Sequence, residues 1–390
     1  MISVTEAKQK VMASSRLLQP VSMAFYKAIG SVLAEDVISN ISIPSFPQSS
    51  MDGYAILFSD KEKPLVIQDE LPAGTGKKIQ LQPGKAIKVF TGGPVPEGAD
   101  TIVQKEWITV GNETIQINHA GVEKGAHIRM PGTDIPKGAL AITKGTLLHT
   151  MHMGLLASIG TTEIAVIRKP SVAIVITGNE LVQPGNPLQF GQVYESNAFA
   201  LKACLIRLFV SEITVCHAKD TLAETESVIF KAISEHDMVL VTGGVSVGEY
   251  DHVAAAFANL GVDKHFHNVK QRPGKPLFFG TMDKKWVFGL PGNPASVLSC
   301  FYQYVMPLIN SIAGVQAPKT VTAKLFASFE KKPPLTFFLK GLHQNGIARI
   351  LQGQASFQLS SFAEANCWIE LPETIAHFNE GDEVFIHPFI

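Results

Sequence analysis

Between residues 171 and 308, short apolar segments alternate with segments of helical periodicity, and this alternation limits the possible folds more than any other feature. The apolar segments are 172–177, 212–217, 238–242 and 286–290. The amphipathic segments that follow them predict helices over 197–207, 223–235, 253–258 and 295–308. Apolar strands separated by helices are typical of a parallel sheet with helices on both faces. We therefore predict a three-layer α/β domain in this region.

In a parallel α/β sheet, ligands bind outside the carboxyl ends of the strands. The third apolar segment runs directly into a glycine-rich turn, within the stretch DMVLVTGGVSVGEYD at 237–251. Gly243, Gly244 and Gly248 leave backbone N–H groups accessible, while Ser246 adds a hydroxyl and Asp251 a carboxylate. This combination indicates a site for a phosphate and its metal ion. The pattern is neither a Walker loop nor a dinucleotide fingerprint, so its meaning depends on the neighbouring strand ends.

The other strand ends are also polar or rich in glycine: 177–180 (TGNE), 218–220 (AKD) and 291–294 (PGNP). Because the carboxyl ends of parallel strands meet at one edge of a sheet, we expect Glu180, Asp220 and Asp251 to share one crevice. Three carboxylates suit a Mg²⁺ ion that bridges substrate phosphates. Each acid by itself is more typical of a structural residue at the protein surface, so the magnesium prediction rests on the three together.

Two further motifs of this region favour anion binding. In 289–296 (GLPGNPAS), Asn293 is placed to cap a helix that starts at Pro294, which would leave N–H groups free for an anion. In 271–276 (QRPGKP), Arg272 and Lys275 flank a Pro-Gly turn that would aim two cations at a phosphate. An ordinary strand-to-helix turn and a solvated basic turn are the respective alternatives.

Outside this region the sequence pattern changes. Residues 3–40 predict helices, over 4–12 and 23–33. From 44 to about 144, Gly, Pro and short alternating segments such as 65–67, 86–90 and 101–104 predict an all-β module. Residues 145–169 predict short helices and strands, and the alternation after Pro318 predicts a small β-barrel or sandwich. In the β module, Asp52 precedes Gly53, as a residue that stabilises a turn would.

Composition argues against several classes of protein. A chain of 390 residues favours two to four domains. A net charge of −1 provides no field that would attract nucleic acid or a membrane surface. No apolar run approaches the roughly 20 residues of a membrane span, and residues 1–15 carry charges where a signal peptide would be apolar. We therefore expect a cytoplasmic protein.

The cysteines and histidines give no metal site by their spacing. The four cysteines lie far apart and form no CxxC pair, so neither disulfides nor a thiolate zinc site is expected. His149 and His152 lie three residues apart, and His265 and His267 alternate, but no nearby carboxylate or cysteine completes either pair. Both pairs are assigned to packing or to the surface.

Taken in order, the motifs resemble the molybdopterin molybdenumtransferase (MoeA-type) family, to which the gephyrin E domain belongs. The motifs that carry this resemblance are MDGYA (51–55), FTGGPVPEGADTIV (90–103), TGNEL (177–181), SNAFAL (196–201), TGGVSVGEYD (242–251), RPGKP (272–276) and GLPGNPAS (289–296). The resemblance implies an elongated helical and linker domain (1–43 and 137–169), an inserted β-rich module (44–136), a molybdopterin-binding α/β domain (170–314) and a C-terminal β-barrel (315–390). It also implies a homodimer whose active cleft is shared between subunits.

The activity implied by the resemblance is Mg²⁺-dependent insertion of molybdate into adenylylated molybdopterin, with release of AMP. The family's functional acids match Asp52, Asp134, Glu180, Asp220 and Asp251, and Asp52 would be delivered from the partner chain. Arg272 and Lys275 would offset negative charge, while Lys340 and Ser356 would face the oxyanion. Substrate would be bound by Thr177, Gly178, Ser196, Asn197, Gly243, Gly244, Ser246, Gly248, Pro273, Gly274, Pro291, Gly292, Asn293, Pro294 and Ser296. The molybdopterin adenylyltransferase would be a protein partner.

Some positions depart from the family pattern. Asn268 stands where many members have a lysine, and Asn179 stands where an aspartate is commoner. Lys340 stands where some members have an arginine, and Lys219 stands where a second acid is common. Two other functions are considered beside the transferase. Adenylyl transfer onto molybdopterin would require only the α/β domain, so the β module and barrel argue against it. A scaffold that clusters other proteins, as gephyrin does, is disfavoured because the acids are intact.

Overall fold

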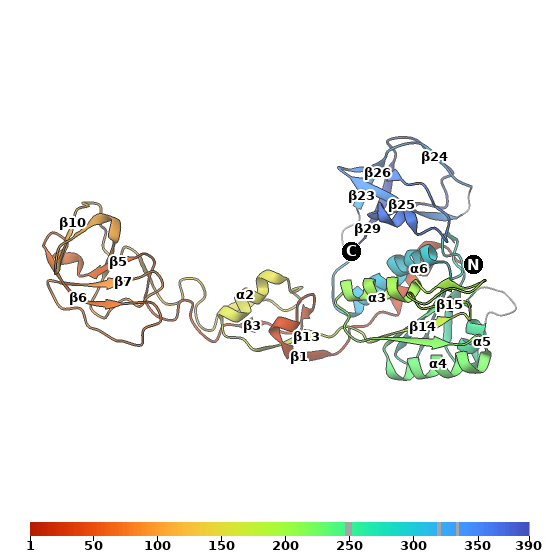
Figure 1. The fold of residues 1–390 in the computed structure, drawn as a ribbon, viewed down its shortest axis with the longest axis horizontal. Coiled ribbons are helices and arrows are strands. Elements are labelled where there is room, and N and C mark those ends of the chain that lie inside the picture. Colours follow the sequence, from red (N-terminus) through yellow and green to blue (C-terminus); the bar gives the residue numbers. More distant parts are fainter. Residues whose placement is uncertain (246–251, 318–320, 333–334, 390) are drawn as a thin grey trace. The chain divides into compact units, whose positions relative to one another are not determined.

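The computed structural model describes residues 1–245, 252–317, 321–332 and 335–389 (Figure 1). The predicted positions Ser246, Gly248 and Asp251 lie outside the described residues. The chain divides into two compact units: one contains residues 1–22, 29–32 and 165–390, and the other contains 23–28 and 33–164.

The predicted parallel sheet is present in the first unit. Its strand order is β17-β14-β18-β22-β21-β19. The first four strands are parallel, as expected: β17 (Ile213–Ala218), β14 (Val172–Thr177), β18 (Met238–Thr242) and β22 (Lys285–Leu290). The prediction missed β21 (Phe278–Met282) and β19 (Asp263–His267), which extend the sheet in antiparallel fashion.

Helices cover both faces of this sheet, which confirms the three-layer arrangement. Every residue of β14 is buried, and its side chains alternate between two hydrophobic clusters. Val172, Ile174 and Ile176 pack with residues of α1 (Val4–Ala13), α3 (Asn197–Arg207), α6 (Pro294–Cys300) and α7 (Met306–Ile312). Ala173 and Val175 pack with α4 (Leu222–Glu235) and α5 (His252–Asn259). A sheet buried on both faces explains the continuous apolar run.

The single helix predicted over 295–308 consists of three segments. A buried π-helical turn, η4 (Phe301–Val305), separates α6 from α7. Pro307 lies in the first turn of α7 and has no N–H to donate to the preceding turn. We attribute the widened turn just before Pro307 to this missing hydrogen bond, because π-bulges accommodate such breaks in the helical ladder.

The C-terminal strands close into a barrel rather than a sandwich. The ring runs β25 (Thr336–Gln344), β26 (Ile347–Ile350), β23 (Val321–Leu325), β29 (Glu383–Pro388), β27 (Cys367–Leu371) and back to β25. A short strand from the α/β part, β20 (Gln271–Arg272), adds to β25 in parallel. A separate pair, β24 (Phe329–Glu330) and β28 (His377–Phe378), and the 3₁₀ turn η5 (Ser360–Ala363) complete this part.

The second unit contains the predicted all-β module. Its main sheet has the order β8-β5-β7-β6-β10-β9, formed by β8 (Thr101–Gln104), β5 (Gly53–Ile56), β7 (Lys85–Val89), β6 (Leu65–Leu71), β10 (Thr114–Ile117) and β9 (Ile108–Val110). Tyr54 and Ile56 pack into one cluster and Ala55 into another, so both faces of β5 are covered. Smaller elements are β4 (Gln48–Ser49), β11 (Ile128–Arg129), β3 (Val37–Ile38), β12 (Leu140–Ile142), η2 (Phe58–Asp60), η3 (Lys105–Trp107) and α2 (Thr150–Ser158).

The predicted helix over 23–33 is wrong. This stretch forms β1 (Pro20–Ala24), the 3₁₀ turn η1 (Phe25–Lys27) and β2 (Val32–Leu33), and β13 (Glu163–Ile167) lies between β1 and β2 in a three-stranded sheet. Gly30 has φ +75°, a left-handed conformation that interrupts any helix, and the ring of Phe209 occupies the space of a side chain at this position. No helix in the described part of the chain combines the length and apolarity that crossing a bilayer requires.

Candidate active site

Two adjoining hollows mark the candidate site, both within the first unit. The inner one, about 330 Å³, lies at the carboxyl ends of the parallel strands, where Thr177, Gly178, Asp220, Gly243 and Gly244 line it. The outer one, about 990 Å³, extends to the barrel and is lined by Arg272, Lys275 and Ser356. Glu180, Leu181, Asn197, Pro276, Pro291 and Gly292 line both hollows. The strand ends therefore converge on one cleft, which we call the strand-end cleft.

The glycine turn after β18 lies directly against the end of β14. Gly243 has φ +85°, and a Cβ at this position would lie 2.8 Å from Thr177 Oγ1. Thr177 is buried, and its hydroxyl donates to the carbonyl oxygen of Thr242 at 3.1 Å. The backbone of the turn can approach a ligand closely because no side chain covers it.

Glu180 and Asp220 reach the inner hollow from neighbouring strands. The Asp220 carboxylate accepts from the Asn179 backbone N–H at 3.0 Å, and the Asn179 side-chain oxygen accepts from the Asp220 N–H at 3.4 Å. These reciprocal bonds join the ends of β14 and β17. Glu180 lies over Gly178, where a Cβ would be 2.9 Å from both carboxylate oxygens. Two of the three predicted magnesium ligands thus line one hollow, and the third, Asp251, lies outside the described residues.

Oxygen donors of this kind fit Mg²⁺, which takes one or two protein carboxylates together with water and phosphate oxygens. Within the described residues, no group of three or more His, Cys, Asp or Glu side chains has the arrangement of a metal site. His265 donates to or accepts from Thr281 Oγ1 at 2.9 Å, and His267 bonds the Val245 carbonyl at 2.8 Å. These two histidines have structural partners, as the sequence predicted.

Buried hydrogen bonds hold the basic turn 271–276 in place. Gln271 is fully buried, and its side-chain amide donates to the carbonyl oxygens of Pro273 at 3.2 Å and Gly274 at 3.0 Å. Tyr304, on the π-helical turn, donates its hydroxyl proton to the Gln271 side-chain oxygen. Sequence reasoning did not identify Gln271 or Tyr304 as part of the site, since nothing in their spacing reveals this contact.

The two cations of this turn face the outer hollow. Arg272 lies 5.5 Å from the centre of the Phe337 ring of the barrel. No salt bridge joins Arg272 or Lys275 to a carboxylate among the residues that the structure describes. Their charge is therefore available to an anionic ligand in the cleft.

The start of α6 is arranged differently from the prediction. Asn293 occupies the N-cap position and Pro294 the first turn, but the Asn293 side chain makes no capping bond. Instead its amide donates to Ser356 Oγ at 3.0 Å, and the Ala295 N–H donates to the Ser356 carbonyl at 3.0 Å. The N–H groups of Ser296 and Val297 bond the Asn293 carbonyl. The prediction of free N–H groups here is wrong because a barrel loop and the turn itself already use them.

The structure does not bring Lys340 to the surface of the cleft. Its side chain is 1% exposed, and its ammonium donates to the carbonyls of Gln358 at 2.7 Å and Ala355 at 3.4 Å. Burial lowers the pKa of Lys340. The ammonium therefore supports the loop that presents Ser356 to the outer hollow, instead of lining that hollow itself.

The remaining predicted acids, Asp52 and Asp134, belong to the second unit. Asp52 Oδ1 accepts from the backbone N–H and the hydroxyl of Thr91, each at 2.8 Å. The backbone hydrogen bond from Thr91, followed by the Thr91 hydroxyl, lowers the pKa of the Asp52 carboxyl. These bonds agree with the turn-stabilising interpretation, and a catalytic role of Asp52 stays a prediction. Asp134 is exposed, and its backbone N–H donates to the Ile43 carbonyl at 3.0 Å.

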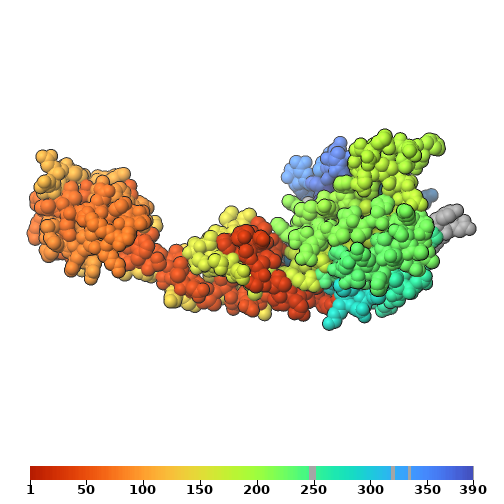
Figure 2. Space-filling view, turned by 60° about the horizontal axis from the view of Figure 1, so that its bottom comes forward, coloured from red at the N-terminus to blue at the C-terminus, as the bar shows by residue number. Residues whose placement is uncertain are grey.

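The segment that leads into α3 forms one wall of the cleft. Two short strands, β15 (Leu181–Val182) and β16 (Val193–Tyr194), pair in parallel, and Ser196 is the N-cap residue of α3. Figure 2 shows this yellow-green segment projecting from the surface of the α/β part. The Asn197 amide donates to the Gly292 carbonyl at 2.8 Å and so joins the start of α3 to the turn before α6.

The fold and the cleft define a multidomain protein built around an α/β domain of the molybdopterin-binding type. Three family models match the chain: the MoeA N-terminal region (domain I and II) over residues 2–160, a probable molybdopterin binding domain over 173–311, and the MoeA C-terminal region (domain IV) over 322–389. The chain belongs to the MoeA family.

Individual relatives agree with this assignment. The molybdopterin molybdenumtransferase of Haemophilus influenzae is 34% identical over 100% of this chain and 99% of its own length. That of Nostoc sp. is 37% identical over 74% of this chain and 69% of its own length. A crystal structure of the molybdopterin biosynthesis MoeA protein from Pyrococcus horikoshii has 29% identity and a TM-score of 0.78, and covers 100% of both chains.

Proposed function

We propose that this chain is a molybdopterin molybdenumtransferase that inserts molybdate into adenylylated molybdopterin and releases AMP, with Mg²⁺ required. The observation that carries the proposal is the pairing of the two hollows. Acids and glycine turns line the inner one, whereas a serine hydroxyl and two cations, which have no acidic partner among the described residues, line the outer one. A phosphoanhydride with its metal ion suits the first set of groups, and an oxyanion suits the second.

Within this proposal, Glu180 and Asp220 would hold Mg²⁺ at the strand ends, and by the family resemblance Asp251 would be the third ligand. The ion would supply withdrawal of charge from the phosphate oxygens. The turns at Gly178 and Gly243 bring backbone groups close to the phosphates, because no side chains intervene. Arg272 and Lys275 stabilise the negative charge that develops on the leaving phosphate as the anhydride bond breaks. Their turn is fixed by buried bonds from Gln271, so little reorganisation accompanies the reaction.

The family resemblance supplies two further elements of the proposal. Asp52 acts from the partner subunit of a homodimer, and Asp134 is a further functional acid. The adenylylated substrate comes from a molybdopterin adenylyltransferase, which acts as a protein partner. The protein works in the cytoplasm, and its net charge of −1 gives no reason to expect nucleic acid or a membrane as a partner.

The test is an assay of AMP release by the purified full-length protein with adenylylated molybdopterin, molybdate and Mg²⁺. We expect release that depends on molybdate and that falls at least about 100-fold in Asp220→Asn and in Asp251→Ala. Asp263→Asn is the matched control, because Asp263 is an exposed acid on β19 of the same sheet and is expected to leave the rate unchanged. Absence of molybdate-dependent AMP, or equal rates in Asp220→Asn and the parent, would refute the transferase. Adenylylation of molybdopterin from ATP would instead support the adenylyltransferase alternative.

A further inference from the structure

Two buried oxygen atoms in the wall of the strand-end cleft have no hydrogen-bond donor among the residues that the structure describes. They are Oε2 of Glu195 and Oδ1 of Asn197, which lie two residues apart at the start of α3. Both residues line the outer hollow, and Glu195 is only 2% exposed. Neither oxygen has a role in the phosphate and oxyanion chemistry proposed above.

The chain fixes both side chains through their other polar atom. Oε1 of Glu195 accepts from the Ala198 backbone N–H at 2.7 Å, and Nδ2 of Asn197 donates to the Gly292 carbonyl at 2.8 Å. The backbone is fixed as well, because the Glu195 N–H donates to the Val182 carbonyl at 2.9 Å. Each side chain is therefore held in one orientation, with one acceptor left over.

A buried acceptor without a donor is costly, and the cost is larger for a carboxylate than for a neutral group. Folded proteins satisfy nearly all such atoms, so those that remain call for a partner. A ligand N–H that bonds one of these oxygens removes the penalty, and at the Glu195 carboxylate the hydrogen bond is charge-assisted. The pair thus favours a ligand edge that carries more than one N–H donor.

We propose that Glu195 and Asn197 recognise the pterin ring of the substrate through the N–H donors of its 2-amino-4-oxopyrimidine edge. This inference rests on the function proposed above. The pterin offers a 2-amino group beside the N3–H, two adjacent donors that match two acceptors. Adenine, the other ring of the substrate, offers one amino group beside a ring acceptor, which matches the pair poorly.

A neighbouring aromatic side chain fits the same ligand. Tyr194 lines the outer hollow with 46% of its surface exposed, and its hydroxyl donates to the Asn186 carbonyl at 3.0 Å. A ring anchored in this way offers a face on which a flat heteroaromatic ring can stack. Edge recognition by Glu195 and Asn197 and stacking on Tyr194 together describe a pterin subsite beside α3.

The inference is tested by comparing two pteridines that differ at one position. Pterin carries the 2-amino donor, whereas lumazine carries a carbonyl acceptor in its place. We expect the parent protein to bind pterin about 10- to 100-fold more tightly than lumazine, as measured by the change in ligand fluorescence on titration. Glu195→Gln replaces the acceptor with an amide that can donate, so this preference should disappear or reverse. Affinity for AMP should stay within about twofold of the parent.

Two variants separate recognition from a merely structural effect. Glu195→Asp retains a carboxylate and should retain the preference for pterin, although more weakly. Glu180→Gln, a matched acid-to-amide change at the inner hollow, should alter AMP binding in the presence of Mg²⁺ without altering the preference. An unchanged preference in Glu195→Gln, an equal loss of AMP and pterin binding, or no pterin binding by the parent at millimolar concentration would overturn the inference. The transferase assay tests the proposed function independently of the pterin subsite. Molybdate-dependent AMP release with no preference for pterin would overturn the pterin inference alone.

Discussion

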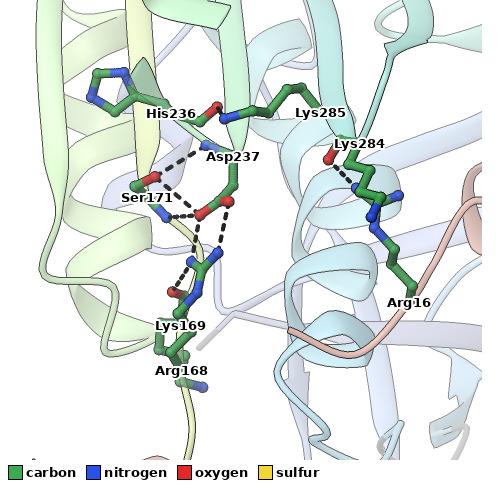
Figure 3. Close-up of polar contacts among 8 residues, drawn as sticks. All are labelled: Arg16, Arg168, Lys169, Ser171, His236, Asp237, Lys284 and Lys285. Carbon is green, nitrogen blue, oxygen red and sulfur yellow. Dashed lines mark hydrogen bonds and ion pairs between the residues drawn. The ribbon is translucent and has the colours of Figure 1, made fainter. Parts of the chain in front are cut away.

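A polar network at the edge of the sheet opposite the cleft allows a quantitative prediction for Asp237→Asn (Figure 3). Asp237 immediately precedes β18, and its carboxylate accepts from the two guanidinium nitrogens of Arg168 at 2.5 and 2.8 Å. It also accepts from the backbone N–H and the hydroxyl of Ser171 at 2.9 and 3.0 Å. The network ties the chain after β13 to the starts of β14 and β18.

The expected magnitude follows from the pKa of this carboxyl. Burial alone would raise the pKa of Asp237, but the hydrogen bonds and charge of Arg168 and the bonds from Ser171 outweigh it and lower the pKa from 3.8 to about 2. A difference of this size corresponds to about 2 kcal/mol of stability at neutral pH. The Arg168 side chain is 33% exposed, so water still solvates the guanidinium when Asp237 is replaced by a neutral residue. An unpaired Arg168 therefore adds little to the loss of stability in Asp237→Asn.

The pH dependence has a definite sign. Because the folded-state pKa is depressed, the contribution is complete above the unfolded pKa near 4 and is lost as the pH falls through about 2. The free energy of unfolding measured in urea should therefore be lower for Asp237→Asn than for the parent, by about 2 kcal/mol at pH 7 and by roughly half that at pH 3. Asp263 is an exposed acid for which the described part of the chain shows no such partners, so Asp263→Asn should change stability by less than about 0.5 kcal/mol. A difference for Asp237→Asn that is equally small, or that does not shrink between pH 4 and pH 3, would refute the reasoning.

Three further predictions concern the cleft and its surroundings. Gly274→Ala should lower the rate of AMP release about tenfold or more, because the new Cβ would lie 2.6 Å from Cys300 Sγ, which packs against the basic turn. Gly261→Ala is the control and should retain the rate, because Gly261 has a similar φ but no described atom within 4 Å of the new Cβ. Lys340→Met should increase hydrogen exchange at residues 355–358, where the ammonium now bonds two carbonyls; unchanged exchange would mean that the loop is held by other contacts. Cys300 and Cys367 should react with a thiol reagent at pH 8 only after unfolding, because burial raises the pKa of both thiols, that of Cys367 to about 11; rapid labelling of the native protein would contradict this.

The features that sequence predicted correctly depend on local patterns. Continuous apolar runs identify β14 and β18 because both faces of these strands are buried. The polar ends of those runs then locate the cleft, since parallel strands end at the same edge. The helix expected over 23–33 fails for the opposite reason: its apolar spacing is helical, but Gly30 and the ring of Phe209 impose a turn.

The features that sequence missed depend on contacts between distant segments. Asn293 looks like a helix cap, but a barrel loop 63 residues further on supplies Ser356 as its partner. The buried amide of Gln271 is engaged by Tyr304, 33 residues away, on a π-helical turn that no periodicity predicts. Glu195 belongs to the same class. Nothing in the spacing of Glu195 distinguishes it from a surface acid, and only its burial in the cleft wall reveals an acceptor without a donor among the described residues.

The cationic chemistry of the outer hollow is concentrated on one turn. Asn268 has φ +74°, a left-handed conformation in which asparagine is favoured over lysine, and its N–H donates to the Leu277 carbonyl. Position 268 therefore carries a residue that suits its backbone conformation and that has no charge. Lys340 is buried and uses its ammonium on two backbone carbonyls behind Ser356. Among the described residues that line the outer hollow, Arg272 and Lys275 are the remaining cations, so an oxyanion bound there would depend on the turn that Gln271 and Gly274 hold in place.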